Sequence, residues 1–317
     1  MIQALDFLDD SQFKGDPVHM SRCYRTKTKG AWGFSTRDQG YVVSDCTSLG
    51  LKAVINFQEK LSYASKSVSK ERLCQAVDIL LDMQNEDGGI ASYELIRGSE
   101  FLEWMNPAEV FGNIMIEYSY PECTSCVMTG LKTFSKYYPD YRADEIKKVC
   151  DKAIKYIYKS QREDGSWYGS WAICFTYAAM FAIEALASNG ETYENSEVVK
   201  KGCEFLISKQ MADGGWGESY KSCELEVYTD HERSQVVNTA WALLALMMAK
   251  YPKEKPIKRG IQLIMKRQLS NGEWKQEAIE GVFNKNCAIS YPNYKFIFTI
   301  WALGKYAKLY GDPTIFV

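Results

Sequence analysis

The feature that most constrains this chain is a repeated turn, in which a Gln is followed four residues later by Gly and six residues later by Trp. The unbroken copies are Gln161–Gly165–Trp167, Gln210–Gly214–Trp216 and Gln268–Gly272–Trp274. A fourth copy, Gln84–Gly88–Ile90, has Ile in place of Trp, and a fifth is stretched between Gln12 and Trp32. Each Gln closes a segment with the apolar spacing of an amphipathic helix, and Asp-Gly or Asn-Gly then predicts a helix end and turn. The chain is therefore predicted to repeat one helical unit five times.

A second and more apolar segment follows each turn, with a Thr near its expected start. These residues are Thr47, Thr124, Thr176, Thr239 and Thr299. Amphipathic helices that alternate with nearly all-apolar helices suit an outer and an inner ring. The sequence thus predicts an all-α fold, an α/α barrel of helical hairpins, as a single domain over residues 1–317. The inner helices would all begin at one mouth, where Asp45, Glu122 and the Thr series are expected to gather.

Composition excludes several classes of function. The net charge of −2 leaves no basic face for nucleic acid. No secretion signal or Asn-x-Ser/Thr site accompanies the ten Cys, so a reduced intracellular chain is expected. The longest uncharged run, 165–183, is predicted to be a buried helix rather than a membrane span. With only His19 and His231 and no phosphate-binding Gly motif, neither a metal nor a cofactor is expected.

Asp45 is the main candidate for chemistry. By its position before an apolar run it would make a good helix N-cap, and Cys46 and Cys123 alone would be small buried hydrophobes. The repeat changes that interpretation, because together with Val43-Ser-Asp45-Cys46-Thr47 it resembles the squalene and oxidosqualene cyclases over nearly the whole chain. Segments such as 106–114 are closest to fungal, lanosterol-forming members of that family.

The resemblance implies an isomerase of sterol biosynthesis that acts without a cofactor. Asp45 would protonate the epoxide of (3S)-2,3-oxidosqualene, and the thiols of Cys46 and Cys123 would hydrogen-bond its carboxyl. Cyclisation to lanosterol or a related triterpene would follow. For Asp45 to stay protonated near neutral pH, its surroundings must raise its pKa far above the usual value.

The resemblance also assigns roles to aromatic side chains, whose faces stabilise cations without trapping them. Phe34, Trp171 and Phe283 would face the successive carbocations. Tyr93 and Tyr291 would line the cavity, with Tyr93 near the site of final deprotonation. The repeat residues Gln161, Trp167, Gln210, Trp216, Gln268 and Trp274 are instead predicted to be structural, with each Trp fastening a turn to a helix.

Two departures from the family affect the expected function. The family motif continues with Ala-Glu, whereas this chain has Ser48 and Leu49 and so lacks a carboxylate. Family members are also much longer, and their amino-terminal half, with a second barrel and the membrane-docking surface, is expected to be absent here. The chain alone is therefore predicted to be inactive. Oxidosqualene, the missing half and a membrane surface are its expected partners, at the cytoplasmic face of the endoplasmic reticulum or of lipid droplets.

Two other classes of protein stay open at this point. One is a non-catalytic relic or accessory fragment of a cyclase. The other is a protein-prenyltransferase β-subunit, which shares the α/α barrel but binds zinc through Asp, Cys and His.

Overall fold

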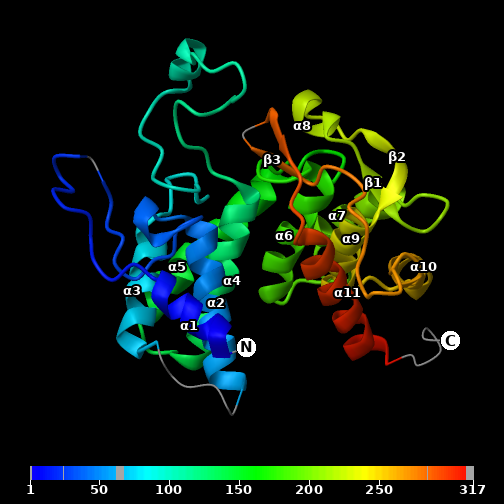
Figure 1. The fold of residues 1–317 in the computed structure, drawn as a ribbon, viewed down its shortest axis with the longest axis horizontal. Helices are drawn as coiled ribbons and strands as arrows, with labels where there is room; N and C mark the ends of the chain where they lie inside the picture. The colour runs from blue at the N-terminus through cyan, green and yellow to red at the C-terminus, as the bar shows by residue number, and fades with distance from the viewer. Residues whose placement is uncertain (1, 24, 62–67, 284, 312–317) are drawn as a thin grey trace. The chain divides into compact units, whose positions relative to one another are not determined.

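The computed structural model describes residues 2–23, 25–61, 68–283 and 285–311. Helices dominate, as Figure 1 shows, and the few strands are short. The helices of the first part of the chain are α1 (Ile2–Ser11), α2 (Ser44–Lys60), α3 (Lys70–Asp82), α4 (Pro121–Tyr137) and α5 (Ala143–Ser160), with 3-10 turns at η1 (Arg37–Gln39) and η2 (Glu100–Met105). Those of the second part are α6 (Cys174–Ser188), α7 (Glu197–Ser208), α8 (Lys221–Leu225), α9 (Val236–Met248), α10 (Glu254–Lys266) and α11 (Tyr294–Tyr310).

The strands form two antiparallel pairs. Strand β1 (Trp216–Glu218) pairs with β2 (Asp230–Gln235), and β3 (Gly281–Phe283) pairs with β4 (Cys287–Ile289). Both pairs lie between the helices of the repeats.

The chain divides into two compact units, each of which is described by itself. The first unit comprises Met1–Glu100 and Ile116–Lys159, and the second comprises Phe101–Met115 and Ser160–Val317. The single catalytic domain over 1–317 stays a prediction.

In the first unit, α2 and α4 pack against each other and the amphipathic helix α3 contacts both. The approach of α2 to α4 is close, because a Cβ added at Gly130 would lie 2.1 Å from the Ser48 hydroxyl. Every residue from Pro121 to Leu131 is buried, although this stretch includes a Glu and several hydroxyl groups. The start of α4 is therefore a polar segment held inside protein.

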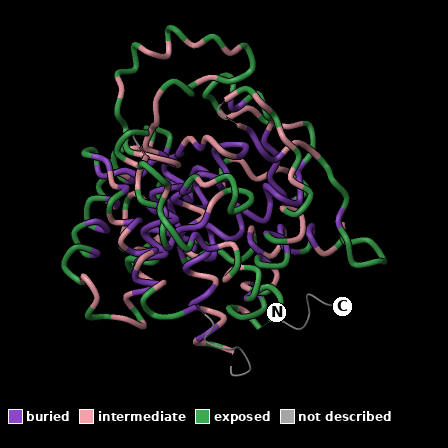
Figure 2. Tube along the Cα trace, turned by 60° about the vertical axis from the view of Figure 1, so that its left-hand side comes forward, coloured by how far each residue is buried: buried purple, intermediate pink, exposed green. Residues whose placement is uncertain are grey.

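In the second unit, α9 packs between the apolar helices α6 and α11, and α7 and α10 cover them. Most of α6 and α9 is buried. Figure 2 colours the buried residues of the chain purple. The run 165–183 was predicted to be a buried helix; its part from Cys174 onward is helical and buried, whereas residues 165–173 form the loop before α6. Among the residues described, no helix has the length and apolarity needed to cross a bilayer.

The side chain of each repeat Gln makes a hydrogen bond to the Gly of its own turn. Its side-chain amide donates to the carbonyl of the turn's Gly, which has a positive φ that favours glycine. Four of the five also donate to a carbonyl of the next amphipathic helix. These second bonds are Gln12 to Arg72, Gln84 to Val149, Gln161 to Val198 and Gln210 to Pro256. Each Gln therefore closes its own turn, and the first four also join that turn to the following repeat.

The repeat Trp and Thr residues add further hydrogen bonds between the turns and their neighbouring helices. The indole nitrogens of Trp32, Trp216 and Trp274 donate to carbonyls of the preceding helix, at Leu8, Leu206 and Ile264. The hydroxyls of Thr47, Thr124 and Thr239 accept the backbone N–H of Trp32, Ile90 and Trp216. All five Thr residues of the series are buried. Three of them thus hydrogen-bond a turn to an inner helix. The Thr series was expected to line a mouth of the barrel, but the structure buries it.

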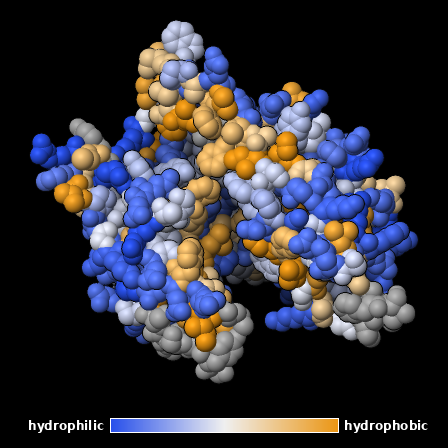
Figure 3. Space-filling model, viewed as in Figure 1, coloured by the Kyte–Doolittle hydropathy of each residue, from blue (hydrophilic) through white to orange (hydrophobic). Residues whose placement is uncertain are grey.

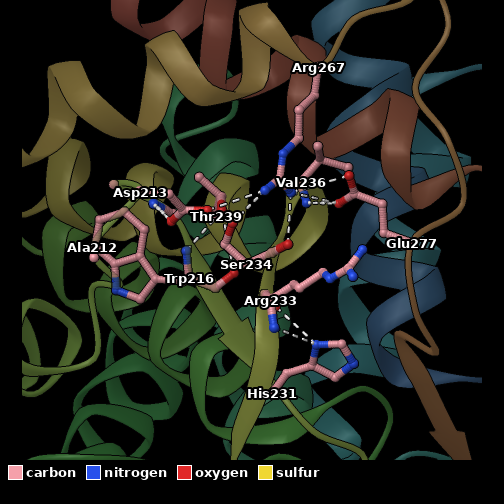
Figure 4. Close-up of polar contacts among 12 residues, drawn as sticks. Ala212, Asp213, Trp216, His231, Arg233, Ser234, Val236, Thr239, Arg267 and Glu277 are labelled. Carbon is pink, nitrogen blue, oxygen red and sulfur yellow. Dashed lines mark hydrogen bonds and ion pairs between the residues drawn. The ribbon is translucent and has the colours of Figure 1, made fainter.

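A polar network surrounds the start of α9 in the second unit (Figure 4). Arg267 donates to the carbonyl and hydroxyl of Ser234 and forms ion pairs with Asp213 and Glu277. Glu277 in turn accepts the N–H of Val236 at 2.7 Å, in the first turn of α9. A polar cleft beside this network is lined by His231, Arg233, Lys266 and Lys275 among others, and by none of the predicted catalytic or cation-facing residues.

Candidate active site

Asp45 lies in the first turn of α2, which begins at Ser44 with Val43 in the N-cap position. Asp45 is therefore not the cap, the role that its sequence position alone suggested. Its Oδ1 accepts the N–H of Cys46 at 2.8 Å, and the Cys46 thiol also hydrogen-bonds the carboxyl. The local fold of α2 thus supplies two donors to one carboxyl group.

The surroundings of Asp45 favour its protonated form. Although the residue is partly exposed, loss of solvation raises the pKa of its carboxyl, and the bonds from Cys46 oppose that shift only in part. Burial, followed by the Asp45 charge, also raises the pKa of the Cys46 and Cys123 thiols. A neutral carboxylic acid beside two neutral thiols can donate a proton to a weakly basic oxygen.

Ser92 connects Asp45's helix to Cys123. Its carbonyl accepts the N–H of Ser44 at 2.8 Å, and its hydroxyl lies 3.4 Å from the Cys123 sulfur. The starts of α2 and α4 are thereby linked, and Cys123 lies close enough to Asp45 for that charge to raise its pKa.

Tyr93 belongs to the same group of residues. Burial raises the pKa of its phenol to about 12, and the charges of Glu117, Asp45 and the two thiols contribute to that rise. The first unit therefore brings together Asp45, Cys46, Tyr93 and Cys123. Phe34 is in the same unit, on the loop before α2, with 49% of its surface exposed.

The second unit brings together Trp171, Phe283 and Tyr291. The rings of Trp171 and Phe283 meet edge to face, with centroids 5.0 Å apart. A β-bridge between Ala172 and Gly281 holds their two segments side by side. The ring of Tyr291 covers Gly281, where an added Cβ would lie 2.2 Å from the phenol ring, so only glycine fits there.

Two carboxyl groups beside these clusters, the half-buried Glu117 and the buried Glu280, were not predicted from the sequence. Glu117 accepts the N–H of Tyr93 at 3.1 Å, and Glu280 is hydrogen-bonded to the N–H of Tyr291. Burial is the main cause that raises the pKa of each carboxyl to about 7. The sequence gives only a weak indication of their burial, because each Glu lies in a loop with apolar or aromatic neighbours. Acidic residues on the surface have the same pattern.

The residues that the structure describes contain no group of three or more His, Cys, Asp or Glu side chains arranged to hold a metal ion. Asp45, Cys46, Cys123 and Tyr93 give the first unit an acid, two thiols and a phenol.

The chain belongs to the squalene-hopene cyclase family: residues 1–308 match the squalene-hopene cyclase C-terminal domain. Within that class it is 60% identical over 315 residues to lanosterol synthase erg7A of Aspergillus fumigatus, which covers 99% of this chain and 42% of that protein. Identity is 54% to lanosterol synthase ERG7 of Saccharomyces cerevisiae and 48% to the human lanosterol synthase, of which the chain covers 44% and 43%. The predicted resemblance to fungal oxidosqualene cyclases is confirmed. The chain spans less than half the length of these relatives.

Solved structures of terpene cyclases share the fold. A variant of the type II terpene cyclase MstE from Scytonema, in complex with merosterolic acid A, matches with a TM-score of 0.63 at 16% identity, over 96% of this chain and 80% of that one. The ent-copalyl diphosphate synthase of Streptomyces platensis matches with a TM-score of 0.59 at 16% identity, over 97% of this chain and 46% of that one. Together with the helical hairpins, these neighbours confirm the predicted all-α fold class, the α/α barrel of this family.

Proposed function

We propose that this chain forms the acid-bearing part of an oxidosqualene cyclase that converts (3S)-2,3-oxidosqualene to lanosterol or a related triterpene. The observation that carries the proposal is the Asp45 carboxyl, whose pKa is raised and which the Cys46 thiol hydrogen-bonds. The names of the relatives, lanosterol synthases of three fungi and human among them, support the choice of substrate.

In the proposed reaction, Asp45 transfers its proton to the epoxide oxygen while a carbon–oxygen bond of the epoxide breaks. The electron pair of that bond stays on the oxygen, which becomes a hydroxyl. The cation left on carbon is attacked by the neighbouring double bond, and cyclisation moves the charge along the chain until a final proton is lost. Asp45 is left as a carboxylate, which the Cys46 N–H and thiol stabilise before a proton returns.

The route by which Asp45 regains its proton differs from the family pattern. Position 49, where the family has Glu, holds a Leu that is 45% exposed. Leu cannot relay a proton, so we expect the proton to come from water that reaches the partly exposed Asp45. The enzyme would then recover more slowly between turnovers than relatives with the carboxylate.

For the migrating cation, we propose that Trp171 and Phe283 supply the aromatic faces, with Tyr93 and Tyr291 lining the cavity and Phe34 contributing a further ring. Each well-placed face stabilises a cation by about 0.5–2 kcal/mol. The edge-to-face contact supports this role, because it fixes the orientation of the Trp171 and Phe283 rings.

A complementation experiment tests the proposed function. The chain would be fused to the amino-terminal segment of the Aspergillus relative that precedes the matched region, and expressed in yeast without lanosterol synthase. We expect growth without added sterol and a tetracyclic alcohol in the extracted lipids. A folded fusion that yields no cyclised product would contradict the proposal and favour the non-catalytic relic.

The chain alone is proposed to be inactive. Purified 317-residue protein would be incubated with oxidosqualene in detergent, and the lipids extracted and analysed. We expect no cyclised product, because Asp45 and Phe34 are partly exposed and water that reaches them would trap the cation. Repeated, protein-dependent formation of a tetracyclic alcohol would show that the remaining half is dispensable. Attachment to the endoplasmic reticulum or lipid droplets stays a prediction.

A further inference from the structure

The segment from Ala91 to Tyr93 has hydrogen-bond partners on two sides. On the side of α2, the Ala91 carbonyl accepts the Ser44 hydroxyl at 2.7 Å and the Ser92 carbonyl accepts the Ser44 N–H at 2.8 Å. The Ser92 hydroxyl contacts the Cys123 thiol. On the other side, the backbone N–H groups of Ser92 and Tyr93 are both bonded to the carboxyl of Glu117.

We propose that Glu117 is a positioning residue of the acid centre: by holding the backbone of Ser92 and Tyr93, it places the Ser92 hydroxyl on Cys123 and the Tyr93 ring beside Asp45. This inference rests on the proposed function, since it concerns the same site. Glu117 acts through the segment and is not proposed to touch the substrate.

A carboxyl group suits this task because of the hydrogen bonds that it can accept. Its oxygens accept both N–H groups and add no competing donor when the carboxyl is ionised. A buried N–H left without an acceptor is costly, so removal of the carboxyl would drive the segment to rearrange. Because the Ser92 carbonyl and hydroxyl contact Ser44 and Cys123, a rearrangement there reaches both helices that carry the acid centre.

The surroundings of Glu117 show that the carboxyl is held against an electrostatic cost. Burial raises its pKa, and the charge of Glu94 raises it further, although Glu94 is itself paired with Arg97 at 3.1 Å. The N–H groups of Ser92, Tyr93 and Tyr118 act in the opposite direction. These backbone hydrogen bonds offset part of the cost of desolvating the carboxyl beside Glu94.

Two variants of the 317-residue protein separate positioning from simple stability. Glu117→Gln keeps one carbonyl oxygen, whose two lone pairs can accept both N–H groups, whereas Glu117→Ala removes both oxygens. The first readout is the alkylation rate of Cys123, resolved by mass spectrometry of the peptides, relative to that of Cys150. Cys150 is a matched control, because it is also buried in the first unit but lies on α5. The second readout is the infrared carbonyl stretch of protonated Asp45, assigned by its loss in Asp45→Asn.

We expect Glu117→Ala to raise the Cys123 rate about tenfold relative to Cys150, the factor that corresponds to about 1.4 kcal/mol. The Asp45 signal should weaken or shift in the same variant, and Glu117→Gln should restore most of both readouts. Equal acceleration at Cys123 and Cys150, or an unchanged Asp45 signal in folded Glu117→Ala, would overturn the inference. If Glu117→Ala does not fold, a Glu117→Gln protein with both readouts far from the wild-type values would overturn it as well.

These outcomes are distinct from a failure of the proposed function. If Asp45 is not a protonated acid, the wild-type protein itself lacks the carbonyl signal, whatever Glu117 does. If only the inference fails, the wild-type signal is present and the Glu117 variants leave it unchanged.

Discussion

The side-chain amide of Gln210 donates to the carbonyl of Pro256 at 2.9 Å, so the turn of one repeat is bonded to the first turn of α10. The same amide donates to the Gly214 carbonyl at 2.8 Å. Gln268 occupies the equivalent position in the last repeat, and in the part of the chain that the structure describes it has only the bond within its turn, to Gly272. The two Gln residues therefore form a matched pair that differs by one bond between repeats.

Gln210→Ala should lower the free energy of unfolding by about 1–3 kcal/mol, because two hydrogen bonds are lost and the Pro256 carbonyl loses its donor. Gln268→Ala should cost less, since its bond is exposed and lies within one turn. Urea unfolding of the two variants measures the difference. Equal losses would mean that the bond between repeats contributes nothing to stability.

Trp167→Ala should lower the free energy of unfolding by about 3–5 kcal/mol, as expected for removal of a fully buried aromatic ring. The ring packs closely on Gly202, where an added Cβ would lie 2.7 Å from the indole, and glycine has no side chain that could move into the cavity. Trp104→Ala is the control, because 84% of that residue's surface is exposed, on the apolar 101–115 segment in the upper part of Figure 3. Thermal unfolding should separate the two variants clearly, and a similar melting temperature for both would refute the packing role.

Asp45→Asn, in a complete cyclase that contains this chain, should reduce turnover by about 10²- to 10⁴-fold or more, because an amide has no acidic proton to transfer. The fold should survive, since the Asn carbonyl can still accept the Cys46 N–H. Product analysis by gas chromatography measures turnover, and circular dichroism checks the fold. Asp82→Asn, at an exposed position near the end of α3, is the control and should be fully active. Substantial cyclisation by Asp45→Asn would exclude Asp45 as the acid.

Glu280 should make the protein less stable as the pH rises from about 4.5 to about 7. Its pKa is raised from 4.5 to about 7, mainly by burial, so in this range the folded state binds a proton that the unfolded state releases. The stabilising contribution of Glu280 to the free energy of unfolding is complete below pH 4.5 and is lost by pH 7. The loss amounts to about 3 kcal/mol at most, and to less where water reaches the carboxyl.

Glu280→Gln should remove this pH dependence and unfold at a higher urea concentration than the wild-type protein at pH 8. The difference between the two proteins should vanish near pH 4.5, which serves as the internal control for the loss of a hydrogen bond. A variant that is less stable than wild type at pH 8 would show that the ionised carboxyl is well accommodated.

Much of the fold could be predicted because the repeat is local. Gln210, Gly214 and Trp216 lie within one turn, and their spacing alone indicates a helix end, a glycine turn and a buried ring. The bond from Gln210 to Pro256 could not be predicted in the same way, because it depends on how one repeat packs on the next. The role of the Thr series was misjudged for a related reason: Thr239 is buried against Trp216, which a helix-start pattern does not reveal.

The candidate acid could be found from the sequence only through a family resemblance, since Asp45 by itself resembles an ordinary helix cap. Cys123 was placed near it by the same resemblance, and the structure adds Ser92 as the physical link. Glu117 could not be predicted, because a Glu in a loop carries no mark of burial. Its partners are backbone N–H groups, and these leave no trace in the identity of Ser92 or Tyr93.

The Gln bonds between repeats also bear on the order in which the chain can assemble as it is synthesised. The second acceptor of Gln12 is 60 residues downstream, that of Gln84 is 65, and those of Gln161 and Gln210 are 37 and 46. A newly made turn therefore waits for the following helix to leave the ribosome before its amide is fully bonded. The turns of the first four repeats would thus be fully bonded only after the next repeat has been made. Correct folding should therefore be favoured by translation pauses placed after these downstream helices rather than after the turns.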